Sequence, residues 1–155
     1  MSVLITANPF GIRTALFARH VQHVVFIHFP IALFVSAVGF DFIAKWKKNQ
    51  ALVATVYFNL LLAAAATIPS LLTGLAAWKW ALTGQALRGI LLMHLVLACT
   101  STALIWVVYL VQWRSLRYPE QPLPGYRLVI EAFAVFLVGL TAHLGGFLSG
   151  VNGPS

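Results

Sequence analysis

Histidine is the residue type in this sequence best suited to chemistry, and three of its five histidines fall at one depth. His28 and His94 lie about one turn inside the start of their apolar segments, and His143 lies about one and a half turns before the end of the last segment. If neighbouring segments cross a membrane in opposite directions, all three side chains lie on the same side, roughly 6 to 8 Å below the interface. His20 and His23 lie just above them, nearer water.

Small residues share the helix faces of these histidines. In membrane proteins such residues mark the side of a helix that packs against other helices, so we expect the histidines to face the bundle interior. The small residues at helical spacing are Ala32, Ser36 and Gly39 after His28, Ala98, Ser101 and Thr102 after His94, and Gly139 before His143. At the same level the second apolar segment offers Thr67, Ser70 and Thr73 around Pro69.

Two neutral imidazoles on facing helices are suitable axial ligands for a b-type haem, which is the leading interpretation of this pattern. The residues expected to form the site are His23, His28, His94, His143, Arg19 and Arg88. His28 and His94 are the expected ligands of the haem iron, and Arg19 and Arg88 would neutralise the propionates. Hydroxyls nearby would fix the imidazole tautomers. Two histidine ligands fill both axial positions and favour electron transfer over oxygen chemistry.

Other interpretations of the histidines stay open. They could form a quinone pocket or a metal site. They could also be structural, since Pro30 removes a backbone hydrogen bond and His28 could satisfy the freed carbonyl, while His94 and His143 could bond to each other. In that case the protein would be a non-redox accessory subunit of a larger membrane complex. Transport of protons or small solutes is disfavoured because no charged side chain lies near the bilayer midplane.

The composition requires membrane-crossing helices to position these residues. Of 155 residues, 61% are hydrophobic and 8% are charged, and the mean hydropathy is +0.90, which is too apolar for a soluble domain of this size. Four long apolar segments predict an all-α integral membrane bundle of four transmembrane helices. The expected spans are residues 24–44, 51–72, 90–111 and 128–148. Residues 1–20 are expected to form an interfacial segment, residues 21–150 the four-helix domain and residues 151–155 a tail.

The basic residues predict the orientation of the bundle. Six lie at the end away from the histidines: Lys45, Lys47, Lys48, Arg114, Arg117 and Arg127. Four lie at the histidine end: Arg13, Arg19, Lys79 and Arg88. The positive-inside rule then places both termini outside the cytoplasm.

The acidic residues are remote from the histidines in this arrangement. Asp41, Glu120 and Glu131 lie on the more basic side. We therefore expect no acid–base pair and no carboxylate–histidine relay, and we expect Asp41 and Glu131 to cap helices or pair with neighbouring Lys and Arg residues.

Several functional classes lack the residues that they require. The net charge of +7 is explained by basic residues flanking the spans, so we expect no nucleic-acid partner. Cys99 is the only cysteine, which excludes an intrachain disulfide, an iron–sulfur cluster and c-type haem attachment. Neither a nucleophile with a base and an orienting acid nor a phosphate-binding glycine loop is recognisable, so we do not expect a stand-alone enzyme.

The segment from His23 to Leu33, HVVFIHFPIAL, resembles the opening of a large family of uncharacterised bacterial four-helix membrane proteins. In that family two histidines five residues apart precede Phe-Pro in the first helix. The likeness continues through Thr73-Gly74, Trp78, His94 after a basic residue and Leu144-Gly145-Gly146. The pattern departs from the family at Val24, where relatives often have proline, at Ala77, where an acid is common, and in lacking a histidine after the final glycines.

The resemblance implies the four-helix fold and a place in the bacterial inner membrane. It carries over His23, His28 and His94 as family histidines, whereas His143 lies outside the pattern. Family members occur beside, or fused to, c-type cytochrome and Rieske-type domains, which implies a redox role in the envelope. The implied partners besides the lipid bilayer are a quinone, a c-type cytochrome or a membrane redox complex, and an oligomer is possible.

Overall fold

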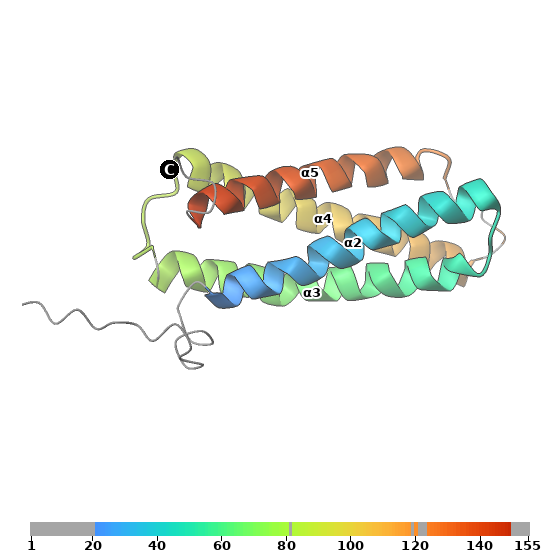
Figure 1. The fold of residues 1–155 in the computed structure, drawn as a ribbon, viewed down its shortest axis with the longest axis horizontal. Coiled ribbons are helices and arrows are strands. Elements are labelled where there is room, and N and C mark those ends of the chain that lie inside the picture. Colours follow the sequence, from blue (N-terminus) through green and yellow to red (C-terminus); the bar gives the residue numbers. More distant parts are fainter. Residues whose placement is uncertain (1–20, 81, 119, 121–123, 150–155) are drawn as a thin grey trace, which may run out of the picture.

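The computed structural model describes residues 21–80, 82–118, 120 and 124–149. These residues form α2 (Val21–Lys47), α3 (Leu52–Trp80), α4 (Gly89–Arg117) and α5 (Arg127–Leu148), with no strand among them (Figure 1). Each helix is long and apolar enough to cross a membrane. The prediction of an all-α bundle with four transmembrane helices is therefore confirmed. The expected interfacial segment and tail, with Arg13, Arg19 and His20, lie outside the described residues.

Left-handed backbone conformations end the first two helices. Lys48 follows α2 with a φ of 51°, and the Asn49 N–H bonds to the Ala44 carbonyl at 2.9 Å. After α3, Gly84 has a φ of 65° and its N–H bonds to the Trp78 carbonyl at 3.0 Å. Such bonds satisfy carbonyls that the end of a helix leaves without a donor. The chain reverses direction after each helix. The starts of α2 and α4 and the ends of α3 and α5 therefore share one end of the bundle (Figure 1).

The four helices pack as two antiparallel pairs. The most extensive contacts join α2 to α3 and α4 to α5, while α3–α4 and α2–α5 contacts join the pairs. The core is a cluster of buried side chains from every helix, centred on Phe34, Leu60, Ile105 and Val138. Because these residues lie in the middle of the bundle and toward the end away from the histidines, the packing is tightest there.

Pro30 lies inside α2 and leaves the Phe26 carbonyl without its helical donor. The Ser70 hydroxyl of α3 lies 3.1 Å from that carbonyl oxygen and 2.8 Å from the Ala66 carbonyl oxygen, and can donate to either. His28 Nδ1 lies 2.5 Å from the Val24 carbonyl oxygen of its own helix. The suggestion that His28 satisfies the freed carbonyl is therefore wrong, because the His28 ring bonds to the Val24 carbonyl and the hydroxyl that reaches the Phe26 carbonyl belongs to Ser70 of the neighbouring helix.

We expect Ser70→Ala to lower the free energy of unfolding by about 1–2 kcal/mol, because the Phe26 carbonyl would then lack a donor in an apolar environment. Ser36→Ala is the matched control, since Ser36 is exposed on α2. Unfolding of both variants would be measured by titration with a denaturing detergent. Equal stability of the two variants would show that the hydrogen bond between α2 and α3 contributes nothing.

Candidate functional site

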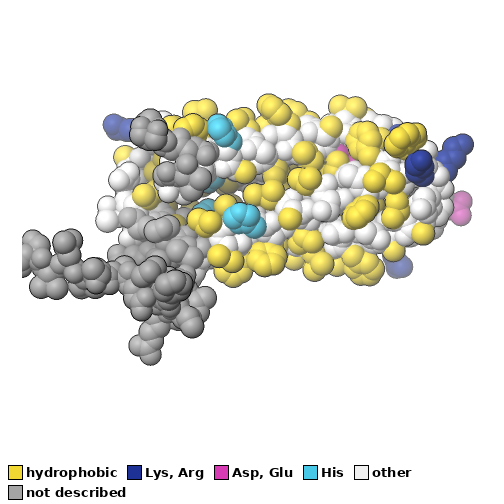
Figure 2. Space-filling view, in the orientation of Figure 1, with side chains coloured by type: hydrophobic (Ala, Val, Ile, Leu, Met, Phe, Trp, Pro, Cys, Tyr) yellow, Lys and Arg dark blue, Asp and Glu magenta, His cyan; other side chains and the backbone are white. Residues whose placement is uncertain are grey.

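The histidines gather in one half of the bundle, and the acidic side chains lie toward the other end (Figure 2). His23 and His28 lie near the start of α2, His94 lies near the start of α4 and His143 lies near the end of α5. The antiparallel helix order predicted this clustering. The structure decides which of these side chains face one another.

The rings of His23 and His94 reach neighbouring helices. His23 Nδ1 lies 3.1 Å from the Ser70 carbonyl oxygen and 3.3 Å from Thr73 Oγ1, both on α3. His94 Nδ1 lies 3.1 Å from the Thr141 carbonyl oxygen on α5. A carbonyl oxygen only accepts hydrogen bonds, so Nδ1 carries the proton in both rings. Each Nε2 therefore keeps a lone pair, and this is a nitrogen through which neutral imidazole binds metal ions.

Glycines on the neighbouring helices make room for both rings. A Cβ atom at Gly74 of α3 would lie 2.9 Å from His23 Cε1, and a Cβ atom at Gly145 of α5 would lie 3.1 Å from His94 Cε1. Each ring thus has a carbonyl partner and a glycine on the same neighbouring helix. Each imidazole is therefore held in the same way, by a carbonyl and a glycine of the neighbouring helix, and both lie in the same half of the bundle.

His28 and His143 lie on the outside of the bundle. The side chain of His28 is exposed, as are Ala32, Ser36 and Gly39 on the same face, so the expectation that this face points inward is wrong. His143 is also exposed, and its ring packs edge-on against Phe147 at a centroid distance of 5.0 Å. His28 and His143 therefore differ from the inward-facing pair although all of them lie in the same half of the bundle.

The buried stripe of α2 explains which histidine faces inward. It contains Pro30, Phe34, Ala37 and Asp41, at spacings typical of one helix face. His23 lies two turns before Pro30 and is in phase with this stripe. On α4, the corresponding stripe of Ser101, Ile105, Val108 and Gln112 is in phase with His94, whose inward orientation agrees with the prediction. The spacing of Pro30 from His23 therefore indicates that His23 faces inward, which the pattern of small residues did not predict.

The half of the bundle around the histidines is loosely packed. Among the described residues of segments 22–29, 71–80, 82–100 and 139–149, none is buried. In the other half, Phe34, Ala37, Ala63 and Ala134 have no exposed surface. His23 and His94 consequently lie among described side chains that are only half-buried or exposed.

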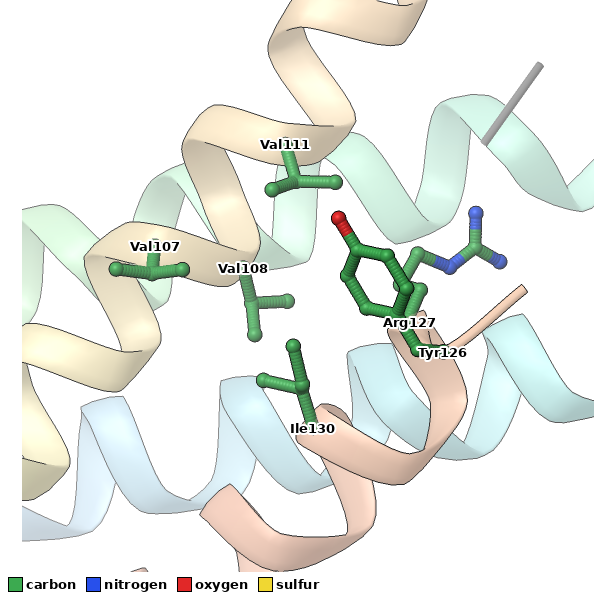
Figure 3. A pocket seen from close by; sticks show the side chains of 6 residues that line it. All are labelled: Val107, Val108, Val111, Tyr126, Arg127 and Ile130. Carbon is green, nitrogen blue, oxygen red and sulfur yellow. The ribbon is translucent and has the colours of Figure 1, made fainter. Parts of the chain in front are cut away.

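A shallow apolar pocket lies elsewhere, between α4 and α5. Its lining residues are Val107, Val108, Val111, Tyr126, Arg127 and Ile130 (Figure 3). The guanidinium of Arg127 extends away from the valines that line the pocket (Figure 3). This pocket is remote from the histidines, and the surface that it offers to a ligand is apolar.

A buried ionic cluster lies at the opposite end of the bundle from the histidines. Arg127 Nη2 of α5 donates a hydrogen bond to Asp41 Oδ2 of α2, and Arg127 Nε lies 3.2 Å from Glu131 Oε1. Pairing of Asp41 and Glu131 with a basic residue agrees with the prediction. Arg127 is itself buried between the two acids.

The histidine pair contains too few ligands for a typical protein zinc site. Zinc is held by three or four protein ligands, and no group of three His, Cys, Asp or Glu residues suited to a metal ion occurs within residues 21–80, 82–118, 120 and 124–149. Haem iron needs only axial ligands from the protein, because the porphyrin supplies the others. Two imidazoles with available Nε2 atoms fit that requirement.

Residues 19–153 match the family described as predicted membrane protein (DUF2231), a domain of unknown function. The chain belongs to this family. No curated protein and no solved structure matches it. The family resemblance seen in the sequence is thus confirmed. In this DUF2231 protein, chemistry must be argued from the geometry of the site itself.

We expect Gly74→Ala to lower the free energy of unfolding of this DUF2231 protein by about 1–3 kcal/mol, because the new methyl group would displace the His23 ring from its carbonyl partner. Gly39→Ala is the matched control, since a Cβ atom at Gly39 meets nothing within 4 Å. This control should stabilise the helix by about 0.5–1 kcal/mol. Thermal unfolding in detergent would compare them, and changes of the same sign would contradict a close approach of His23 to Gly74.

Proposed function

We propose that this DUF2231 protein is a small membrane cytochrome, or cytochrome-like electron-transfer subunit, that holds a b-type haem between His23 and His94. The observation that carries this proposal is the arrangement of the two imidazoles. Both donate Nδ1–H to a backbone carbonyl of a neighbouring helix, which leaves both Nε2 atoms available. In haem and metal sites, such an outer hydrogen bond orients the ring and raises its basicity as a ligand.

Within this proposal the ligand pair differs from the pair expected from sequence. His94 remains, and His23 replaces His28, because the exposed His28 ring bonds to its own helix. When bound, the haem would supply reversible one-electron redox chemistry. His23 and His94 would hold the iron through Nε2 and keep the proton on Nδ1, and the four helices would shield the site.

The surroundings of the pair support a planar cofactor. The described side chains around the pair are less buried than those of the core half, and Gly74 and Gly145 let the rings sit back against the helix backbones. Arg88 is exposed in an extended conformation immediately before α4, at the histidine end. A guanidinium there suits the carboxylates of haem propionates. Arg19, proposed for the same role, lies outside the described residues.

The distribution of charge supports an orientation and a set of partners. Lys45, Lys47 and Lys48 follow one another at the end away from the histidines, where the exposed Arg114 and Arg117 also lie. By the positive-inside rule that end faces the cytoplasm of a bacterial inner membrane, and the histidine end faces outward. The haem would then exchange electrons with a quinone, a c-type cytochrome or a membrane redox complex near the outer face. The protein would act as a subunit and not as a stand-alone enzyme.

The test is a dithionite-reduced minus oxidised visible spectrum of the protein, purified in detergent from haem-replete cells. We expect the sharp bands of a low-spin b-type haem, with electron paramagnetic resonance of the oxidised protein showing two imidazole ligands. Haem extraction would give the amount bound per chain. A flat spectrum from folded protein would overturn the proposal and favour a non-redox accessory subunit.

A further inference from the structure

The ionic cluster at the end away from the histidines contains more negative than positive charge. Asp41, Arg127 and Glu131 have exposed fractions of 5%, 8% and 1%. If all three were ionised, the cluster would carry a net charge of −1 within the bundle. An uncompensated buried charge is strongly unfavourable in a membrane protein, so something must neutralise it.

The two carboxyl groups also approach each other. Asp41 of α2 and Glu131 of α5 share one guanidinium, because Arg127 Nη2 donates to Asp41 Oδ2 and Arg127 Nε lies 3.2 Å from Glu131 Oε1. Two ionised carboxylates have only acceptor oxygens and repel each other. A proton on one of them removes this repulsion and allows a hydrogen bond between the two carboxyl groups.

A second, independent observation concerns the unpartnered polar atoms. Glu131 Oε2 and Gln112 Oε1 are buried and have no hydrogen-bond partner among the described residues. The Gln112 side chain is 2% exposed and belongs to the buried stripe of α4. Arg127 Nε and Nη1 are also buried without a hydrogen-bond partner, so the guanidinium leaves Glu131 Oε2 unpaired although Arg127 Nε lies 3.2 Å from Glu131 Oε1. A proton on the Asp41–Glu131 pair removes the negative charge that Arg127 does not balance.

The other charged and titratable groups nearby do not neutralise the second carboxylate of the cluster. Lys45 of α2 also acts electrostatically on Glu131, but its side chain is exposed to solvent. On α4, Tyr109 packs against Tyr57 of α3 at a centroid distance of 6.0 Å. Arg127 is thus the buried cation of the site, and it balances only one of the two carboxylates.

We propose that Asp41 and Glu131 together bind one proton inside the membrane, with Arg127 as the counterion of the carboxylate that stays ionised. On release, the O–H bond of the protonated carboxyl breaks, its electron pair stays on the carboxylate and the proton passes to water. Asp41 lies about 9 Å from the end of α2 at Lys47, so the exchange takes place with water at that end of the bundle. This proton site is independent of any cofactor at the histidine end.

The test is infrared spectroscopy of the full chain in detergent, with glutamate labelled with carbon-13 at the side-chain carboxyl. We expect the carbonyl stretch of a protonated carboxylic acid at neutral pH and its loss at alkaline pH, with the isotope shift reporting the share on Glu131. Glu131→Gln and Asp41→Asn should each abolish the protonated-acid band, because the single remaining carboxylate is balanced by Arg127. Glu120→Gln, at an exposed position, should keep the band.

Stability gives a second readout that does not depend on assigning the band. The folded protein holds a proton that the unfolded chain releases, so raising the pH should favour unfolding of the wild type. Glu131→Gln resembles the protonated acid in shape and charge, so its unfolding midpoint should lose this dependence on alkaline pH. Absence of a protonated-acid band in the wild type, or its survival in either the Glu131→Gln or the Asp41→Asn variant, would overturn the proposal.

Discussion

His94→Leu is expected to leave the purified protein without the haem that we propose it binds. Removal of an outer hydrogen-bond partner alone typically weakens metal binding about 10–100-fold, so loss of an axial ligand should weaken haem retention by about 100-fold or more. His23→Leu should have the same effect, because the second axial position would also lose its imidazole. Haem per chain, from the reduced minus oxidised spectrum and from extraction, measures the loss.

His28→Leu and His143→Leu are the matched controls for that experiment. Both remove an imidazole from the same half of the bundle, but from exposed positions. We expect both variants to keep their haem and their low-spin spectrum. Circular dichroism would confirm that all four variants fold. Retention of haem in His23→Leu together with its loss in His28→Leu would restore the ligand pair expected from sequence and refute the one argued from the structure.

The second large effect is expected at the ionic cluster. Arg127→Met keeps an aliphatic stem of similar length but removes the guanidinium that faces Asp41 and Glu131. Breaking a buried ion pair by removing one partner typically costs about 3–5 kcal/mol, because the remaining charge stays buried without compensation. We expect a loss of this size in the free energy of unfolding, measured by titration with a denaturing detergent.

A control and a rescue distinguish this effect from a general loss of charge. Arg117→Met removes an exposed cation from the end of α4 and should change stability by less than about 0.5 kcal/mol. Adding Asp41→Asn to Arg127→Met removes the stranded carboxylate, so part of the lost stability should return. If Arg127→Met and Arg117→Met were equally stable, the buried cluster would not support the fold.

Together the two sites assign different roles to the two ends of the bundle. His23 and His94 lie in the loosely packed half, where a cofactor can be accommodated, whereas Asp41, Arg127 and Glu131 lie at the end of the tightly packed half. The proposals for the two sites make separate predictions. A colourless protein with a protonated carboxylic acid would remove the electron-transfer function and leave the proton site intact.

The sequence alone determined the fold and the depth of its polar residues. Long apolar segments can cross a bilayer only as structures that satisfy their own backbone hydrogen bonds, so four such segments with short connections imply four antiparallel helices. Depth along a helix follows from residue number, which is why the grouping of His28, His94 and His143 at one end was predictable. The pairing of Asp41 with a basic residue followed from the same reasoning.

Only the tertiary structure decided which side of each helix faces its neighbours. In a membrane helix, lipid-facing and buried faces are both apolar, so hydrophobic periodicity does not separate them and small residues are an incomplete guide. Ala32, Ser36 and Gly39 consequently predicted the wrong face of α2 and favoured His28 over His23. The burial of Arg127 between Asp41 and Glu131 also required the packing of α2 against α5, because contacts between residues far apart in the chain depend on helix rotation and not on residue spacing.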